Sequence, residues 1–578
     1  MAGSLTAQIA KVKVAPRVYP DDKSWAGVGK VALGRRPVIT SGVISGALRM
    51  HQATSSRRLS RGTHLATPKS CAYLVPLGLL TVGAPALASD FVDTRLNVTL
   101  TNENVLAAPG ETNPPVPGWR FDRPNQLGVL FFDNYDTRFT GYESLTHVVL
   151  YKAVQRQRWE AEAAYVLRLL QFSDVNLSSI DDGSYIKVNY YFDPTRARRT
   201  NVSVTAFPLN SDRMRLGYSW RLSWGGSPIF FKANPDVSTN LNPPPTPPVP
   251  GLRIQIADDR WYAYFGAKTS VLRYEQDQEL HSVYGLLGGA GVDLVPGHLR
   301  LEANGGFFDR GTIPRVLTQR LPVQTYGVSV QLSAWDRLSP SLSADTALYR
   351  NDPNSAARYL TKPLYTPGIS WLLMSEFTAE ATTLENPDQA ESSRAQWGLA
   401  GDVNFRLQYG NFRYRLDAMY RSLQYLLVNQ PSLVPFQDFP SGDGVEIRPE
   451  LFAATGVDYY VEKSGTTVGV TVGVDRPASY KPPTSSVNPL DSSPAILVVR
   501  NQGDVVILPQ GQDTLPALAT KLAARQDFLE MFALIVETYY QYDPNGTRLV
   551  TDPATQLKQR VFENPNRLGF NFTLQARF

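Results

Sequence analysis

The chain of 578 residues is long enough for several soluble domains, but its composition points to a different class of protein. Charged residues make up 19% and aromatic residues 11%, and no run of 18 apolar residues occurs. A helical membrane protein needs about 20 consecutive apolar residues for each span, so that class is excluded. A transmembrane β-barrel scatters its apolar residues, because only alternate side chains face lipid.

The net charge of +5 comes from the amino-terminal part of the chain. Residues 1–88 hold 12 of the 57 Lys and Arg but only 2 of the 52 Asp and Glu, which leaves 45 basic and 50 acidic side chains elsewhere. The remainder is therefore acidic, and we expect no nucleic-acid partner. The single cysteine, Cys71, also lies in this part, so the remainder has no disulfide and no thiolate metal site. We expect no metal and no cofactor.

A secretory signal peptide is predicted at residues 50–88. Basic residues lead into an apolar run from Ala72 to Ala84, which is too short to span a membrane. Ala86 and Ala88 then provide the small residues that signal peptidase recognises. We expect cleavage after Ala88.

The chain is therefore expected to have three parts. Residues 1–49 show neither a period nor an apolar face. Either they come from a start called too far upstream, with Met50 the true initiator, or they belong to an unusually long leader. The signal peptide follows, and residues 89–578 form the mature domain.

The mature domain alternates between apolar and polar residues in one segment after another, which is the pattern of half-exposed β-strands. The clearest segments are Met214–Trp224, Ala395–Tyr409 and Phe412–Arg421. Further candidates are Thr94–Asn102, Leu145–Val154, Trp159–Gln171, Gly183–Phe192, Asn201–Phe207, Trp261–Tyr274, Leu280–Leu294, His298–Phe308, Thr325–Trp335, Ser341–Tyr349, Gly368–Thr382, Glu450–Val461, Thr466–Val474, the stretch around Phe528–Tyr542 and the last strand. The pattern predicts about 16–18 strands.

A transmembrane barrel explains these strands better than a soluble β-sandwich. Many segments reach 10 residues, as crossing a bilayer obliquely requires about 9–11. Aromatic residues gather near segment ends, as they do at membrane interfaces, and arginine recurs on the polar face. We predict an all-β fold, an antiparallel up-and-down transmembrane β-barrel.

The connections between segments alternate between tight turns and long loops, so we expect short periplasmic turns and long external loops. The tight ones are residues 295–297, 409–411 and 463–465; the long ones include the proline-rich stretches 107–119 and 234–251, and also 428–445 and 475–494. The sequence of residues 515–525 is compatible with two structures. One is a short helix in an inward-folded loop or plug, and the other is the start of a strand.

The carboxy terminus ends in an alternating segment whose last residue is aromatic. Its apolar face comprises Leu568, Phe570, Phe572, Leu574, Ala576 and Phe578. This segment resembles the terminal strand by which outer-membrane barrels are recognised for assembly. The resemblance implies the outer membrane of a Gram-negative bacterium as the location, with its lipid and the barrel-assembly machinery as partners.

Catalysis is not expected, because no histidine falls in a nucleophile motif. His147 has polar neighbours, whereas His281 and His298 lie near a charged loop and a turn. Asp181-Asp182 and Asp258-Asp259 could bind calcium in a loop, but solvated turns explain both pairs. Gly288–Gly291 lacks the lysine of a phosphate loop and indicates a bend or close packing within a strand.

The polar face of the strands carries many basic side chains, which we expect to line the barrel interior. They are Arg168, Lys187, Arg213, Arg215, Arg221, Arg300, Arg406, Arg413, Arg415 and Arg421, with Asp402 and Asp417 among them. Such a set would favour anions, since guanidinium is permanently charged and binds carboxylate or phosphate through two parallel hydrogen bonds. The alternative is that these arginines pair with interior acids and only brace the wall.

In size, early signal, proline-rich loops and arginine-lined strands, the chain is similar to porin-like exporters of the alginate-export type. That resemblance implies a conduit for anionic solutes or polysaccharides. The alternative is a closed structural barrel whose external loops bind a partner in a surface machine, or periplasmic export components. An open interior requires arginines facing water, whereas a closed one has them neutralised and the barrel filled. An outer-membrane hydrolase would need His147 beside a serine and an acid.

Overall fold

The computed structural model describes most of the chain between residues 95 and 577. The described ranges are 95–102, 104–106, 141–172, 175–181, 183–195, 200–212, 214–217, 222–230, 248–273, 280–313, 321–338, 340, 368–389, 391–429, 438–439, 442–483, 495–499, 505–528, 532–552, 556 and 558–577. The expected leader and signal peptide (1–88), the proline-rich stretch 107–119 and the predicted strand Ser341–Tyr349 lie outside these ranges.

One antiparallel sheet of nineteen strands dominates the fold. Its strands are β1 (Arg95–Asn102), β2 (Gly141–Arg156), β3 (Trp159–Phe172), β4 (Val175–Asp181), β5 (Tyr185–Tyr191), β6 (Asn201–Phe207), β7 (Gly251–Ala257), β8 (Trp261–Arg273), β9 (Leu280–Val295), β10 (Leu299–Thr312), β11 (Pro322–Asp336), β12 (Ile369–Glu385), β13 (Ser393–Tyr409), β14 (Phe412–Arg421), β16 (Glu450–Val461), β17 (Thr466–Arg476), β21 (Ala517–Phe528), β22 (Phe532–Tyr542) and β25 (Asn566–Arg577). Alternating burial along these strands gives the sheet two distinct faces.

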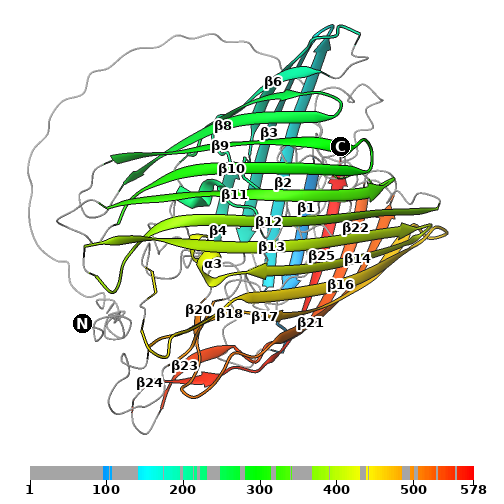
Figure 1. The fold of residues 1–578 in the computed structure, drawn as a ribbon. Helices are drawn as coiled ribbons and strands as arrows, with labels where there is room; N and C mark the ends of the chain where they lie inside the picture. The colour runs from blue at the N-terminus through cyan, green and yellow to red at the C-terminus, as the bar shows by residue number, and fades with distance from the viewer. Residues whose placement is uncertain are drawn as a thin grey trace, which may run out of the picture. The chain divides into compact units, whose positions relative to one another are not determined.

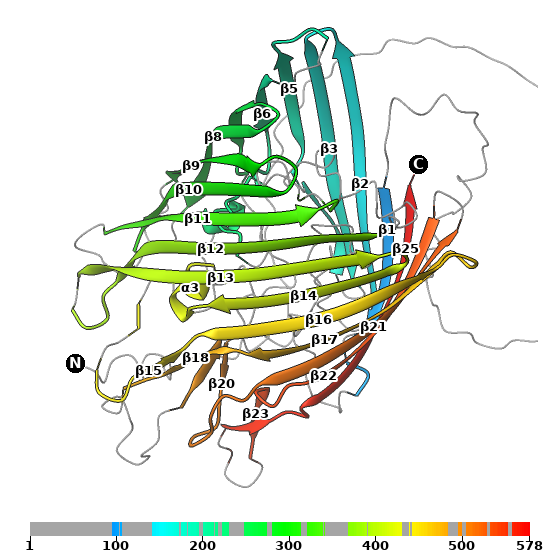
Figure 2. The same ribbon diagram turned by 45° about the vertical axis from the view of Figure 1, so that its right-hand side comes forward.

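The succession of strand pairings is circular. Each strand pairs with the next along the chain, and β25 pairs back with β1 through residues from Arg95 opposite Arg577 to Asn102 opposite Phe570. Strands β4 and β5 pair with successive parts of β3 and so share one place. Nineteen strands thus fill eighteen places in an up-and-down β-barrel, at the upper end of the predicted range (Figures 1 and 2).

Both β1 and β25 have their outer chain ends at the same rim, which we call the turn end. There β2–β3, β7–β8, β9–β10, β13–β14 and β16–β17 are joined by short turns. Gly297, Gly410 and Gly465 lie in three of these turns with positive φ angles, as tight hairpins require. The prediction of short turns fails for two connections at this rim, which are residues 192–200 between β5 and β6 and residues 337–368 between β11 and β12. The opposite rim, the loop end, carries most of the long connections.

The outward face of the barrel is apolar between two levels of aromatic residues. On β12 from Ile369 to Thr383 and along β13 no outward-facing position carries a charge, whereas the inward positions include Glu376, Asp402 and Arg406. Trp397 packs edge-to-face on Tyr326 near the loop end, and the exposed Tyr409 lies at the turn end of the same strand. Twelve residues separate Trp397 from Tyr409, which spans about 28 Å for a strand tilted by about 45°. That height matches a bilayer.

Some elements lie off the barrel wall. Residues 208–230, which we call the inward segment, end in the 3-10 helix η3 (Ser227–Phe230), and α3 (Leu423–Asn429) follows β14. Near the loop end lie a four-stranded sheet and a hairpin. The sheet comprises β15 (Glu446–Arg448), β18 (Ala478–Lys481), β19 (Leu497–Val499) and β20 (Val505–Ile507); the hairpin is β23 (Thr547–Thr551) with β24 (Lys558–Phe562). Within the described residues no helix is long and apolar enough to cross a membrane.

The strand predicted at Met214–Trp224 is wrong. Outside residues 218–221, which the structure does not describe, this stretch has only one isolated bridge, between Leu216 and Trp224. Both side chains, together with Met214, are almost completely buried rather than lipid-facing. The alternation of apolar and polar residues belongs to an extended segment whose apolar side chains pack against the inside of the barrel wall.

Other differences are smaller. Strands β4 and β7 of the ring were not predicted, and neither were the short strands off the wall. Residues 515–525 form the start of β21 and not a helix. The remaining strands on which the structure bears lie within a few residues of their predicted positions.

Candidate functional site

The inward segment approaches the barrel wall at glycines. A Cβ atom on Gly251 or Gly266 would lie 2.7 Å and 3.1 Å from atoms of the Met214 side chain. A Cβ on Gly306 would lie 2.5 Å from Cδ1 of Leu216. Because these wall positions lack side chains, the segment can pack directly on the backbone of the sheet.

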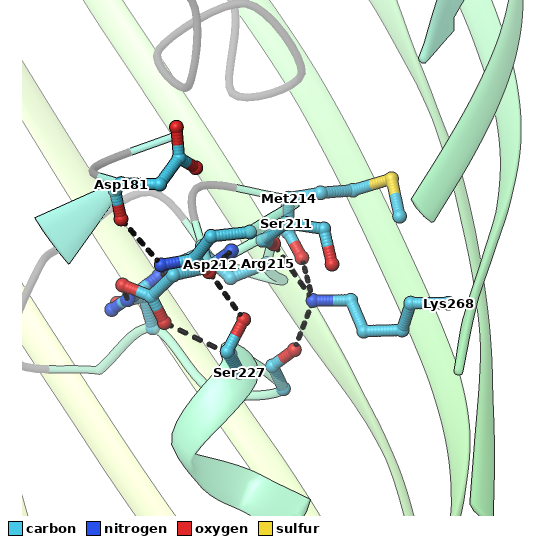
Figure 3. A network of polar contacts seen from close by, with 10 residues as sticks. Asp181, Ser211, Asp212, Met214, Arg215, Ser227 and Lys268 are labelled. Atoms are coloured by element: carbon cyan, nitrogen blue, oxygen red, sulfur yellow. Dashed lines mark hydrogen bonds and ion pairs between the residues drawn. The ribbon is translucent and has the colours of Figure 1, made fainter. Parts of the chain in front are cut away.

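A lysine of the wall holds the same segment by its main chain. The Nζ atom of Lys268, on β8, donates hydrogen bonds to the carbonyl oxygens of Ser211 (3.0 Å), Met214 (2.5 Å) and Gly225 (2.8 Å) (Figure 3). An ammonium group has three donors, so all three are used. The segment is braced internally as well, since Asp212 accepts a hydrogen bond from the backbone N–H of Ser227 at 2.9 Å.

Two further side chains attach the segment to neighbouring strands. Trp224 donates from Nε1 to Oγ of Ser329 on β11 at 3.1 Å. Arg310, on β10, donates from Nε to the carbonyl oxygen of Ile229 at 2.9 Å. The inward segment is therefore fixed to three wall strands by polar contacts.

The inward segment meets α3 within the barrel. The hydroxyl of Tyr425 donates to the carbonyl oxygen of Leu222. The helix itself packs on Gly398 of β13, where an added Cβ would lie 2.7 Å from Cα of Tyr425. The apolar cluster around this contact comprises Leu222, Ala400, Met419, Tyr425, Phe452, Ala454, Ala517 and Ala519. The inward segment, bound to β8, β10 and β11, thus meets α3, which packs on β13, inside the ring, and we call this pair the constriction.

Helix α3 is supported from the loop end. Leu423 and Leu426 share an apolar cluster with Ala478, Tyr480 and Val499 of the four-stranded sheet. The stacked rings of Phe439 and Tyr480, with centroids 4.2 Å apart, belong to the same cluster. The external sheet therefore holds α3 in place.

Of the seven predicted interior basic residues whose side chains the structure describes, five form ion pairs with acids on the same face of the wall. The pairs are Lys187 with Glu162 (3.9 Å), Arg300 with Asp293 (2.6 Å), Arg406 with Asp417 (3.2 Å), Arg413 with Asp458 (2.6 Å) and Arg421 with Glu450 (2.5 Å). Several of these partners stand directly opposite each other on adjacent strands. The interior is therefore closer to electrically balanced than the arginine count suggests.

Arg415 of β14 belongs to the same inward-facing set. It stands directly opposite Arg406 in the β13–β14 register, and like charges in that position repel. Its Nη2 atom instead reaches across β16 to Oγ1 of Thr471 on β17. Gly456 lies beneath this path, because a Cβ there would be 2.8 Å from both Nε of Arg415 and Oγ1 of Thr471.

Glycines of β9 allow the same kind of crossing. The hydroxyl of Tyr262 on β8 passes over Gly291 and donates to Glu302 on β10. Next to it, Tyr264 passes over Gly289 and donates to Asn304 at 2.8 Å. The close packing predicted for Gly288–Gly291 is confirmed, and its role is to let side chains join strands two places apart.

Replacing Gly291 by alanine is expected to lower the free energy of unfolding by about 1–3 kcal/mol. The new Cβ would lie 2.4 Å from Cε1 of Tyr262, which must then give up its hydrogen bond to Glu302. Gly305→Ala is the matched control, because its Cβ meets only ordinary contacts from 3.4 Å. Urea unfolding of both variants in lipid vesicles measures the difference, and equal stabilities would show that the crossing contributes nothing.

The structure does not place all predicted interior residues in the wall. Arg215 belongs to the inward segment, where it pairs with Asp212 at 2.5 Å, because the strand that was expected to carry it does not exist. Arg213 and Arg221 fall outside the described residues, as does the side chain of Arg168 on β3. Asp402 and Asp417 face inward and are buried. The contacts of Lys268, Arg310 and Tyr425 were missed by sequence reasoning.

The other candidate sites have structural explanations. Asp181 accepts a backbone hydrogen bond from Gly183 at 3.3 Å and closes the turn between β4 and β5. Asp258 accepts a hydrogen bond from Thr200 at 2.7 Å, and His298 contacts the carbonyl of Trp335 at 3.2 Å. The described residues contain no group of three or more His, Cys, Asp or Glu that could hold a metal ion.

On the carboxy-terminal strand, Phe572 and Leu574 face outward and are about half exposed. The side chain of Phe578 lies outside the described residues, and the role of this strand as an assembly signal stays a prediction.

A closed ring of antiparallel strands with an apolar belt and a polar interior defines a transmembrane β-barrel. Single-chain barrels of this type with an even number of strands belong to the outer membrane of Gram-negative bacteria. The chain is an outer-membrane β-barrel.

No family model and no curated protein matches the chain in sequence. Among solved structures, the chain is similar to the outer-membrane protein OpdK of Pseudomonas aeruginosa, at 7% identity and a TM-score of 0.38 over 84% of this chain and 98% of that one. A BenF-like porin of Pseudomonas fluorescens Pf-5 is 8% identical with a TM-score of 0.38, covering 84% and 97%. OprD of Pseudomonas aeruginosa is 8% identical with a TM-score of 0.35, covering 84% and 93%. Likenesses at this level carry no argument about function.

Proposed function

We propose that the protein is a porin-like outer-membrane channel whose conduit is narrowed by the constriction. A barrel with eighteen strand places is too wide for its own side chains to fill and leaves room for water. One observation carries the proposal: charged and amide side chains cover the inward face between the constriction and the turn end. Examples are Gln408, Arg413, Arg415, Asp458 and Lys521.

The constriction, rather than the wall, limits what passes. The apolar side chains that face inward on β3, β5, β6, β8, β9 and β10 cover the inward segment, and this cluster includes Val166, Tyr185, Phe207, Val283, Leu287 and Phe308. Because the inward segment covers these apolar side chains, a solute in the conduit contacts polar wall side chains and the constriction. We propose that the substrates are small hydrophilic solutes.

Selectivity among ions is proposed to be modest and to favour anions slightly. The ion pairs neutralise much of the arginine field, since a guanidinium bound to a carboxylate attracts a passing anion less strongly. Arg415 stands directly opposite Arg406, and this juxtaposition of like charges is proposed to supply the anion preference. An acidic polysaccharide would have to pass the same constriction.

The purified protein in planar bilayers is expected to give stable single-channel currents with a small anion preference. Reversal potentials across a salt gradient measure that preference, and Arg415→Met is expected to reduce it. Glu376→Gln, on the same interior face, is the opposing control and should increase it. Block of the current by an acidic oligosaccharide would add polymers to the substrates, and strict cation selectivity would contradict the proposal.

A second candidate function is a closed barrel whose external sheet binds a partner in a surface machine. The neutralised arginines and the contact between Tyr425 and Leu222 favour this alternative. A folded, heat-modifiable protein without any conductance would support it and would exclude the channel.

A further inference from the structure

We propose that Lys268 is the positioning residue of the inward segment and thereby sets the solute size limit of the channel. This inference rests on the proposed channel function and assigns control of its solute size limit to one side chain of the wall. Three observations support it: the position of Lys268 in the wall, the spacing of its three acceptors, and the nature of the other attachments.

Lys268 lies on β8, opposite Gly251 in the β7–β8 register, at the point where β7 begins and the chain returns from the interior. Its side chain is 2% exposed. A buried ammonium is strongly unfavourable unless hydrogen bonds satisfy it, so its three carbonyl acceptors determine where it lies. The side chain and the segment hold each other in place.

The acceptors come from both arms of the inward segment. Ser211 and Met214 belong to the first arm, and Gly225 belongs to the arm that returns after the bridge between Leu216 and Trp224. One ammonium therefore clamps two passages of the chain together (Figure 3). No apolar contact can do this, because packing has no directional requirement.

The first arm has attachments of its own before Met214, since Asn210 donates to the carbonyl oxygen of Asp181 on β4 at 3.0 Å and Ser211 donates to that of Val249. The others hold the returning arm. Trp224 binds Ser329, and Arg310 binds the carbonyl of Ile229. Without Lys268 the first arm keeps its packing on the wall glycines and its hydrogen bonds at Asn210 and Ser211, but the carbonyl of Met214 loses its bond to the wall strand β8. The carbonyls of Met214 and Gly225 would then favour contact with water, and the two arms would separate beyond Ser211.

Lys268→Met tests the proposal in planar bilayers. The expected result is a rise in single-channel conductance of at least about twofold, admission of larger neutral polymers, and loss of protease protection in the inward segment. Arg567→Met is the matched control, because Arg567 is 6% exposed and binds Glu563 at 3.2 Å at the loop end of β25, away from the inward segment. Conductance, size limit and protection equal to those of the unchanged protein would overturn the proposal.

A cross-link supplies the second test. Cysteines at Leu216→Cys and Gly306→Cys would face each other, because a Cβ on Gly306 lies 2.5 Å from the Leu216 side chain, and the described residues contain no other cysteine. In the Lys268→Met background, oxidation should restore the original conductance and reduction should raise it again. A rise that persists after oxidation would contradict the proposal.

If Lys268→Met does not fold, the same cysteine pair is placed in the protein that keeps Lys268. Oxidation should then leave the conductance unchanged, because Lys268 already holds the segment. A fall in conductance on oxidation would show that the segment moves freely despite Lys268 and would overturn the inference. Absence of current from the unchanged protein would instead refute the channel itself.

Discussion

Excision of the inward segment is expected to raise single-channel conductance several-fold, because an eighteen-place barrel that keeps only α3 inside it leaves a wider aqueous pore. The excision replaces the chain between Ser211 and Val249 by a short Gly-Ser linker. The two ends already meet at the wall, since the N–H of Ser211 donates to the carbonyl oxygen of Val249 at 2.9 Å. The free energy of unfolding should fall by on the order of 5 kcal/mol, because apolar side chains of the wall lose their cover.

A hairpin at the loop end provides the control for this excision. The residues between Gly546 and Glu563 include β23 and β24, and the N–H of Glu563 donates to the carbonyl oxygen of Gly546 at 2.9 Å. Replacing that stretch by the same linker removes a paired element outside the ring and should leave conductance unchanged. Equal conductance of both excised proteins and the unchanged one would show that the inward segment does not narrow the conduit.

Most of the ring could be predicted from the sequence, because lipid imposes the same alternation on every strand. Strand β16 matches its predicted bounds, and β14 does too. Registers within the tight hairpins also follow from the sequence. Once a turn is placed at Gly410 and Asn411, Tyr409 faces Phe412 and each further pair follows.

The inward segment could not be predicted in this way. An extended chain that packs on the inside of a wall buries alternate side chains, as a lipid-facing strand does, so period alone does not distinguish the two. Two local features of the sequence could have distinguished the inward segment from a lipid-facing strand. Gly225 and Gly226 follow directly after Trp224, and Asn210 with Asp212 offers turn chemistry directly after the short β6.

The pairing of interior arginines with acids could not be predicted from the sequence, for a different reason. Arg413 meets Asp458, and Arg421 meets Glu450, across the junction of β14 and β16. The intervening chain contains α3 and a long loop, so no turn fixes that register. The arginines could be assigned to a face, but their partners depend on a pairing that only the assembled sheet determines.

Replacing Glu450 by alanine is expected to lower the free energy of unfolding by about 3–5 kcal/mol. The side chains of Arg421 and Glu450 are 6% and 2% exposed, and removal of the acid leaves a buried guanidinium without its carboxylate. The pair lies next to α3, since Arg421 ends β14 and α3 begins two residues later, at Leu423. The loss of stability in Glu450→Ala therefore indicates how far water is excluded from the barrel interior at the constriction.

The exposed pair of Arg448 with Asp513 is the matched control, because their side chains are 24% and 55% exposed. Asp513→Ala should lower stability by less than about 1 kcal/mol. Replacing both members of the buried pair, as Arg421→Met with Glu450→Leu, should restore most of the loss, since no charge is then left buried. Urea unfolding in vesicles measures all three variants. If Glu450→Ala behaves like Asp513→Ala, water reaches Arg421, and the constriction at this level is wider than the contact of Tyr425 with Leu222 implies.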